Sequence, residues 1–178
     1  VNFLGLVAFE DPPKANMAEV FRQFDAAGIA VKIITGDNAL TTAAIAKQIG
    51  FKGAERMMSG DDMMKLGDTG LREAVNDTTI FTRMFPEAKL RIIHALQAEG
   101  HVVAMTGDGV NDGPALKAAH IGIAMGLRGS ELAKEAAAII LTNDDLGSMV
   151  DAVAMGRKIY SNLKKAIQYI ISIHIPII

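Results

Sequence analysis

Two aspartates four residues apart, Asp108 and Asp112, are the residues of this sequence best suited to chemistry. They lie in the string Thr106–Asp112, which reads Thr-Gly-Asp-Gly-Val-Asn-Asp. The run 101–105 before it predicts a buried strand, and 113–119 after it predicts a helix with proline in its first turn. Ligands bind at the carboxyl ends of strands in open α/β sheets. The carboxylates suit Mg²⁺, and the glycines let backbone N–H groups approach an anion.

The alternative interpretation of this string is a tight strand-to-helix turn whose acids only cap the helix. A cap needs one acid, whereas the string contains a second acid and two glycines as well. For the whole string we therefore favour a ligand site. For Asp112 taken alone, the ligand and the cap explain the sequence equally well.

Two further segments place polar groups where they could converge on the same site. Thr35-Gly36-Asp37 ends an apolar run and offers a hydroxyl and a backbone N–H to phosphate oxygens, although a plain turn also explains it. Lys89 lies in the first turn of a helix that begins at Pro86, where cations are disfavoured, although a solvated lysine is the simpler explanation. Combined with the aspartates, these groups would form a phosphoryl-transfer site. The sequence contains neither a G-x-x-x-x-G-K-[ST] loop nor a further acid at another predicted strand end.

Composition sets limits on the kind of protein. The chain has 178 residues, of which 50% are hydrophobic, so it can form one domain, or one domain with an appendage, and this composition argues against disorder. A formal net charge of −2 without Lys/Arg clusters argues against a nucleic-acid partner. The chain has no cysteine and therefore no thiolate metal site, and no signal peptide is visible. Because Val1 is not an initiator methionine, we expect an internal piece of a longer protein.

The predicted elements alternate between strands and helices, which indicates a parallel α/β sheet. Besides the central strand and helix, the expected strands are 3–9, 29–34, 79–83, 121–125 and 138–141, and the expected helices are 14–27, 40–49, 86–98 and 131–137. Residues 52–78 are expected to form short helices on one side of the sheet, without chemistry. Their four methionines, at positions 57, 58, 63 and 64, could bind a soft metal, but without cysteine we favour a gap-filling role.

The C-terminal segment differs from the rest of the chain. No strong helix breaker occurs between Ser148 and Pro176, which predicts one long helix. Residues 166–178 are almost wholly apolar, but these 13 residues are fewer than the roughly 20 that cross a bilayer. A buried helix or a truncated membrane span would explain them, and we favour the span. Lysines precede the apolar run, as the positive-inside rule expects on the cytoplasmic side, at positions 158, 164 and 165.

Taken together, these motifs resemble the P-type cation-transporting ATPases, which belong to the haloacid-dehalogenase-like phosphotransferases. The resemblance rests on Thr106–Asp112, on Thr35–Asn38 and on Asp11–Lys14, and it extends over 121–126 and 156–163. It implies an α/β fold with a haloacid-dehalogenase-like Rossmannoid parallel sheet, flanked by helices and followed by a long C-terminal helix.

The resemblance also implies a division of the chain. Residues 1–145 would be the C-terminal part of the phosphorylation domain, and residues 146–178 would be the stalk and a truncated transmembrane helix. In the family, the strand that carries the phosphorylated aspartate lies between the strands that end at Thr35 and Thr106. Its Asp-Lys-Thr-Gly-Thr motif is absent here. Segments 31–34 and 102–105 are therefore expected about 10 Å apart, twice the strand spacing, without shared hydrogen bonds.

Roles for matching positions follow from the resemblance alone. Asp108 would be a ligand of Mg²⁺, and Asp112 would lie at the edge of the metal site. The phosphoryl group would be held by the remaining catalytic positions: Thr35, Gly36, Lys89 and Asn111. Asp37 and Asp11 would be hinge and nucleotide-side positions.

The implied activity is ATP hydrolysis through an aspartyl-phosphate, coupled to cation transport. The implied cofactors are Mg²⁺ and ATP, and the implied partners are the transported cation, the lipid membrane through the C-terminal helix, and the rest of the polypeptide. The chain would belong to a multi-pass protein of a prokaryotic plasma membrane, with residues 1–165 cytoplasmic. The chain alone is expected to be inactive, because the motif of the phosphorylated aspartate is missing. A polar His174 next to Pro176 is expected to face the interior of the membrane bundle, near the ion path.

Several departures leave the transported cation open. Gly113 stands where the family usually has alanine, and His120 where an acid is common. Thr106 and Lys117 resemble the calcium and sodium/potassium pumps, yet residues 172–178 lack the Asn and Glu that calcium pumps carry there. Two alternative functions are a non-catalytic Mg²⁺- and phosphate-binding regulatory module derived from such a pump, and a stand-alone phosphatase. The missing nucleophile and the apolar tail argue strongly against the phosphatase.

Overall fold

The computed structural model describes residue 4, residues 12–14 and residues 16–174. The predicted strand 3–9 lies almost entirely outside the described residues. Asp11 and residues 175–178 lie outside them as well, and so does the side chain of His174.

Six short strands form two parallel sheets of three strands each. The first sheet has the order β1-β3-β2, and its strands are β1 (Ile33–Ile34), β2 (Met57–Ser59) and β3 (Ile80–Thr82). The second has the order β4-β5-β6, with β4 (Ala104–Gly107), β5 (Ile121–Met125) and β6 (Ile139–Leu141). The parallel α/β architecture is thus confirmed. Within the described part of the chain no ladder joins β1 to β4, as expected if a strand between them is missing.

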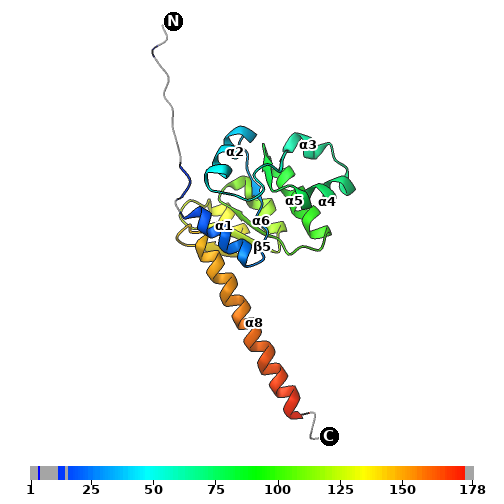
Figure 1. Cartoon of the computed structure of the whole chain (residues 1–178), viewed down its shortest axis with the longest axis vertical. Helices are drawn as coiled ribbons and strands as arrows, with labels where there is room; N and C mark the ends of the chain where they lie inside the picture. The colour runs from blue at the N-terminus through cyan, green and yellow to red at the C-terminus, as the bar shows by residue number, and fades with distance from the viewer. Residues whose placement is uncertain (1–3, 5–11, 15, 175–178) are drawn as a thin grey trace.

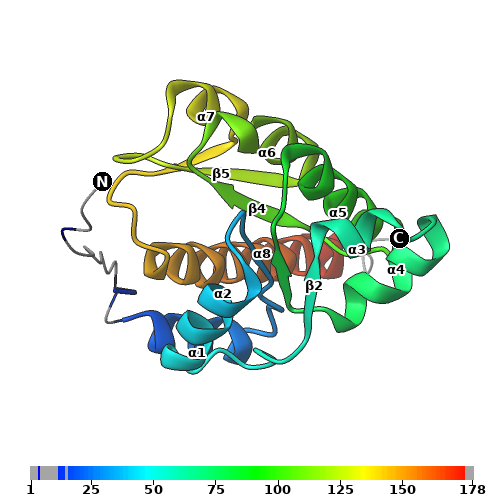
Figure 2. The ribbon, with the colours of Figure 1, turned by 90° about the horizontal axis from the view of Figure 1, so that it is seen from above.

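Eight α-helices and a short 3₁₀ turn accompany these strands in the described part of the chain. They are α1 (Met17–Ala26), α2 (Ala39–Gln48), α3 (Gly60–Met64), α4 (Asp68–Asp77), α5 (Pro86–Ala98), η1 (Val110–Asp112), α6 (Gly113–Ala118), α7 (Glu131–Ala136) and α8 (Gly147–His174). Helices α5, α6 and α7 lie together beside β4 and β5, whereas α1 lies next to the beginning of α8 (Figures 1 and 2). Helix α8 then projects from the rest of the structure as a long rod (Figure 1).

The main core lies beneath helices α4, α5 and α6. Its largest fully buried side chains include Phe81 of β3, Ile92 and Ile93 of α5, and Leu116 of α6. Met63 is 0% exposed in the same core. Two other methionines of the segment pack against this cluster, and the fourth packs in a second cluster around Phe51. The gap-filling interpretation of these methionines is confirmed, since flexible thioethers fill irregular spaces between larger groups.

Two predictions for the first sheet were wrong. Residues 52–78 were expected to form only helices, but they include β2, whose three residues show no apolar alternation and so carry too little signal to mark a strand. β1 was predicted over 29–34 but pairs only at Ile33 and Ile34. Part of the difference comes from Ile29, whose N–H donates to the carbonyl of Phe24 and so belongs to the end of α1.

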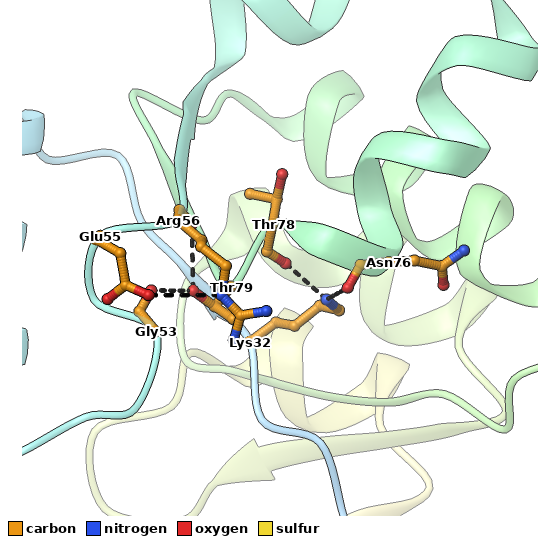
Figure 3. A network of polar contacts seen from close by, with 7 residues as sticks. All are labelled: Lys32, Gly53, Glu55, Arg56, Asn76, Thr78 and Thr79. Carbon is orange, nitrogen blue, oxygen red and sulfur yellow. Dashed lines mark hydrogen bonds and ion pairs between the residues drawn. The ribbon is translucent and has the colours of Figure 1, made fainter.

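A polar network at the amino ends of the first sheet holds β1 against β3 (Figure 3). Lys32 Nζ donates to the carbonyl oxygens of Thr78 at 2.6 Å and Asn76 at 3.4 Å, at the C-terminal end of α4, where a cation is favoured. Burial, and secondarily the charge of Arg56, lower the pKa of Lys32. Thr79 Oγ1 donates to the carbonyl of Arg56 at 3.1 Å and so ties β3 to the segment that leads into β2. The network therefore fixes the strand that ends at the candidate site.

The C-terminal helix was predicted as one long element, and α8 confirms this over 147–174. Apolar residues along it are exposed, for example Leu163 at 58% and Ile167 at 56%. Within the described residues, however, no helix is both long enough and apolar enough to cross a membrane. The predicted membrane span is therefore not shown.

Candidate functional site

A pocket of about 320 Å³ opens between the carboxyl ends of β1 and β4. The groups around it come from both sheets, from α5 and from the turns after β4 and β5, and they are Ile34, Thr35, Gly36, Lys89, Met105, Thr106, Gly107, Asp108, Asp112, Met125 and Arg128. Five of the eight predicted site residues are among them: Thr35, Gly36, Lys89, Asp108 and Asp112. A second hollow of about 380 Å³ lies between α4 and α5, and none of the predicted site residues lines it.

Asp112 organises the floor of this pocket. Its Oδ1 lies 2.6 Å from Lys89 Nζ, and the two side chains are only 10% and 16% exposed. Its Oδ2 accepts hydrogen bonds from the backbone N–H groups of Asp108 at 3.3 Å and Gly109 at 3.1 Å. Its carboxylate makes no capping bond to α6, but the bond from Gly109 caps the 3₁₀ turn that leads into α6, so Asp112 is both a cap and the ion-pair partner of Lys89. The ion pair also explains how a lysine is tolerated in the first turn of α5.

Asp108 is held by its backbone and leaves its carboxylate available. Its carbonyl accepts from the N–H of Ser130 at 2.8 Å, and its N–H donates to Asp112. The carboxylate has no hydrogen-bond or ion-pair partner among the described residues. Groups of three or more His, Cys, Asp or Glu placed to hold a metal are likewise not found in that part of the chain. Mg²⁺ is commonly bound by one or two carboxylates, with phosphate oxygens and water completing its shell, so one free carboxylate fits this ion.

The other predicted residues divide into those at the pocket and those away from it. Thr35 Oγ1 donates to Asp37 Oδ2 at 3.1 Å and accepts from the N–H of Asp37 at 3.1 Å, so these residues form a closed turn after β1. Asp37 itself does not line the pocket, and Asn111 is exposed outside its lining. Asp11 lies outside the described residues.

The sequence interpretation missed two residues near this site, Arg128 and Asp144. Arg128 follows β5 and lines the pocket. Asp144 is only 5% exposed, and its two carboxylate oxygens accept the N–H groups of Leu127 and Arg128, each at 3.0 Å. Lys14 Nζ donates to the backbone carbonyl of Asp144 at 2.6 Å. A polar residue just after a parallel strand is a signal that would have identified Arg128, whereas no pattern in the sequence singles out Asp144 from its acidic neighbour.

The contacts of Asp144 predict a specific pH dependence of stability. Hydrogen bonds from the N–H groups of Leu127 and then Arg128 lower the pKa of this carboxyl below its ordinary value of about 3.8. The unfolded chain therefore takes up the proton first as the pH falls. The stabilisation is complete above about pH 3.8 and is lost as the pH falls through the lower folded-state pKa.

We expect Asp144→Asn to reduce the free energy of unfolding at neutral pH, and this deficit to shrink as the pH falls below about 4. Urea denaturation from about pH 6 to about pH 3 measures it. Asp151→Asn, an equal charge change at an exposed position of α8, is the matched control and should track the unsubstituted chain. A deficit that stays constant across this range would contradict the prediction.

The close approach of Gly107 to Asp112 leads to a second prediction. A Cβ built at this position would lie 2.6 Å from Asp112 Cβ, which is too close for any side chain. At Gly109 the nearest atom to such a Cβ is Asp112 Oδ2, at 3.5 Å, an ordinary contact. We expect Gly107→Ala to displace Asp112 and destabilise the fold by about 1–3 kcal/mol, as overpacking does.

Gly109→Ala is the control for this substitution, and we expect it to change the free energy of unfolding by no more than about 0.5 kcal/mol. Urea denaturation at neutral pH measures both variants. Equal destabilisation by the two alanines would show that backbone freedom, and not contact with Asp112, explains the glycine at position 107.

Comparison with known proteins relates this arrangement to one family. Residues 1–120 match the family model described as haloacid dehalogenase-like hydrolase. The chain is 48% identical, over 170 residues, to a probable cation-transporting ATPase F of Mycobacterium tuberculosis, covering 93% of this chain and 19% of that protein. It is 43% identical, over 173 residues, to calcium-transporting ATPase 1 of Bacillus cereus, covering 96% of this chain and again 19% of the relative.

Solved structures agree with this relationship. A zinc-transporting PIB-type ATPase in the E2.Pi state superposes with a TM-score of 0.67 at 30% identity, over 88% of this chain and 21% of that one. The catalytic domain of the CPx-ATPase CopB-B superposes with a TM-score of 0.59 at 27% identity, over 79% of this chain and 45% of the other. The chain therefore spans about a fifth of the length of the curated relatives that it matches.

Proposed function

We propose that this chain, which belongs to the haloacid dehalogenase-like hydrolase family, supplies the Mg²⁺- and phosphate-binding groups of an ATP-driven cation pump. It corresponds to the phosphorylation-domain region of P-type cation-transporting ATPases. The pump would work through an aspartyl-phosphate intermediate. The observation that carries this proposal is the meeting of Thr35, Gly36, Lys89 and Asp108 around one pocket between β1 and β4.

The roles proposed for the residues at the pocket are those that the family relationship implies. Asp108, with its unengaged carboxylate, would bind Mg²⁺, which when bound supplies positive charge to the phosphoryl oxygens. Thr35 and Gly36 would hold phosphate oxygens at the end of β1. Lys89 would neutralise phosphate charge, and Asp112, already engaged with Lys89 and two N–H groups, would hold the ammonium and the loop in position at the edge of the metal site.

The remaining predicted roles are proposed on the family relationship. Asn111 would contact the phosphoryl group after a small movement of its loop, because it stands outside the pocket lining. Asp37 and Asp11 would lie on the hinge and nucleotide side, where ATP enters. Mg²⁺ and ATP are thus the proposed cofactors, and the phosphorylated aspartate would come from elsewhere in the polypeptide, because the sequence lacks its motif.

The wider setting is proposed in the same way. Residues 1–145 would belong to the phosphorylation domain, and 146–178 would form the stalk and the beginning of a membrane helix, with residues 1–165 on the cytoplasmic side of a prokaryotic plasma membrane. The exposed apolar residues of α8 and the lysines that precede residue 166 favour this assignment. The partners would be the rest of the polypeptide, the lipid membrane and the transported cation, which the sequence leaves open.

A titration of this chain with inorganic phosphate and Mg²⁺, followed by the amide NMR signals, tests the proposal. We expect phosphate to shift the signals of Gly36 and Gly107–Gly109, more strongly with Mg²⁺ present. Asp108→Asn should remove the Mg²⁺ dependence. If the signals at the pocket do not move, the proposal is wrong. Continuing the reading frame upstream of Val1 then separates the pump from a non-catalytic regulatory module, since only the pump requires an Asp-Lys-Thr-Gly motif there.

A further inference from the structure

The charge balance of the pocket would favour a second cation beside a bound phosphoryl group. Lys89 is the cation at its floor, and its ammonium is already paired with Asp112 at 2.6 Å. The free carboxylate of Asp108 adds negative charge to the same space. A phosphoryl dianion entering the pocket would therefore find Lys89 partly neutralised. Arg128, at the mouth, is the other cation that lines this pocket.

Arg128 is presented by a turn whose backbone is fixed at both ends. Gly126 N–H donates to the carbonyl of Leu141 at 2.9 Å, and Ser130 N–H donates to the carbonyl of Asp108 at 2.8 Å. A Cβ built at Gly129 would lie 1.9 Å from the carbonyl oxygen of Met125, so the turn closes too tightly for any side chain there. The turn is thus tied directly to the residue proposed to bind Mg²⁺.

Asp144 holds the centre of this turn and also the guanidinium. Its carboxylate accepts the N–H of Arg128 at 3.0 Å, and its Oδ2 lies 3.6 Å from Arg128 Nε. The Arg128 side chain is nevertheless 64% exposed. A contact through Nε leaves the two terminal nitrogens of the guanidinium for another partner, and this fork fits two oxygens of a phosphate.

We propose that Arg128 is a second phosphate ligand of this site, which grips phosphoryl oxygens at the mouth of the pocket, and that Asp144 is its positioning residue. The inference rests on the proposed function, because it assumes that the pocket receives a phosphoryl group. It adds a cation from the turn after β5 to Lys89 of α5. It also links the pocket to the start of α8, which begins three residues after Asp144.

Phosphate titration of the whole 178-residue chain with Mg²⁺, followed by amide NMR, tests this inference. We expect Arg128→Ala to weaken phosphate binding about tenfold, as the loss of a hydrogen bond to a charged group implies. Arg128→Lys should recover part of the affinity, because the charge remains and the fork is lost. Leu127→Ala, at an exposed neighbour in the same turn, should bind phosphate as the unsubstituted chain does. Lys89→Met is the positive control and should weaken binding.

The outcomes separate the two proposals. If Arg128→Ala binds phosphate normally while Lys89→Met does not, Arg128 is no ligand and the proposed function stands. If phosphate fails to bind the unsubstituted chain at this pocket, the proposed function fails and the inference fails with it. The role of Asp144 is tested by a double-mutant cycle. Asp144→Asn should weaken phosphate binding when Arg128 is present and have no effect in the Arg128→Ala background, whereas equal effects in both backgrounds would show that Asp144 only stabilises the fold.

Discussion

Asp108→Asn should lower the rate of phosphoenzyme formation at least about a hundredfold in the complete polypeptide that contains this chain. The asparagine keeps the size of the side chain and its backbone contacts to Ser130 and Asp112, so the loop should retain its shape. What is lost is the one carboxylate at the pocket that has no partner within the described residues. Mg²⁺ would then lose a charged ligand, and the phosphoryl group would lose the compensation of its negative charge.

The rate at which radiolabelled phosphate from ATP appears in acid-stable phosphoprotein, at saturating ATP and a fixed Mg²⁺ concentration, measures this effect. ATP binding itself should change little, because Asp108 is not proposed to contact the nucleotide. Asp151→Asn on α8 makes the same change of charge at an exposed position away from the pocket and should leave the rate unchanged. A normal phosphorylation rate for Asp108→Asn would show that this aspartate is not the Mg²⁺ ligand.

The elements that the sequence predicted best are those with local signals at both ends. α5 begins at Pro86 and ends before Gly100, and its bounds are those predicted. β5 likewise matches its apolar run over 121–125. β1 was overestimated because the length of a paired strand is set by its partner, and β3 provides only three residues. The residues of β3 that set this limit lie about 47 positions further along the chain, so no local pattern can predict it.

The difference between local signals and contacts distant in the sequence also explains which features of the candidate site could be predicted. Residues at strand ends and at one helix start were predicted to converge, since the carboxyl ends of parallel strands lie on one edge, and five of them do line one pocket. The specific partners could not be predicted. The pairing of Lys89 with Asp112 joins residues 23 positions apart, and the bonds from Asp144 to the turn at Arg128 span 16 positions. Which of several acids makes such a contact depends on tertiary packing that composition and spacing do not encode.

The isolated chain should release no measurable phosphate from ATP, because the sequence lacks the Asp-Lys-Thr-Gly-Thr motif that accepts the phosphoryl group. A sensitive phosphate assay with the purified chain measures this, and the Asp108→Asn chain, purified in parallel, reports any contaminating ATPase. Hydrolysis present in the unsubstituted chain and absent from Asp108→Asn would show that the chain is catalytically complete and that the proposed division of labour is wrong.

The isolated chain should also self-associate. Within the described residues, β1 and β4 both lie at the edge of their sheets, and unpaired edges offer N–H and C=O groups to another chain. Val102, just before β4, is 80% exposed and apolar.

We expect Val102→Lys to reduce association measured by light scattering, because charges at an edge oppose strand pairing. Leu40→Lys, where the leucine is 86% exposed but belongs to helix α2 and not to a strand, should not reduce it. Helix α8 offers the competing explanation, and if Leu163→Lys alone abolishes association, the apolar face of that helix and not the strand edges holds the chains together.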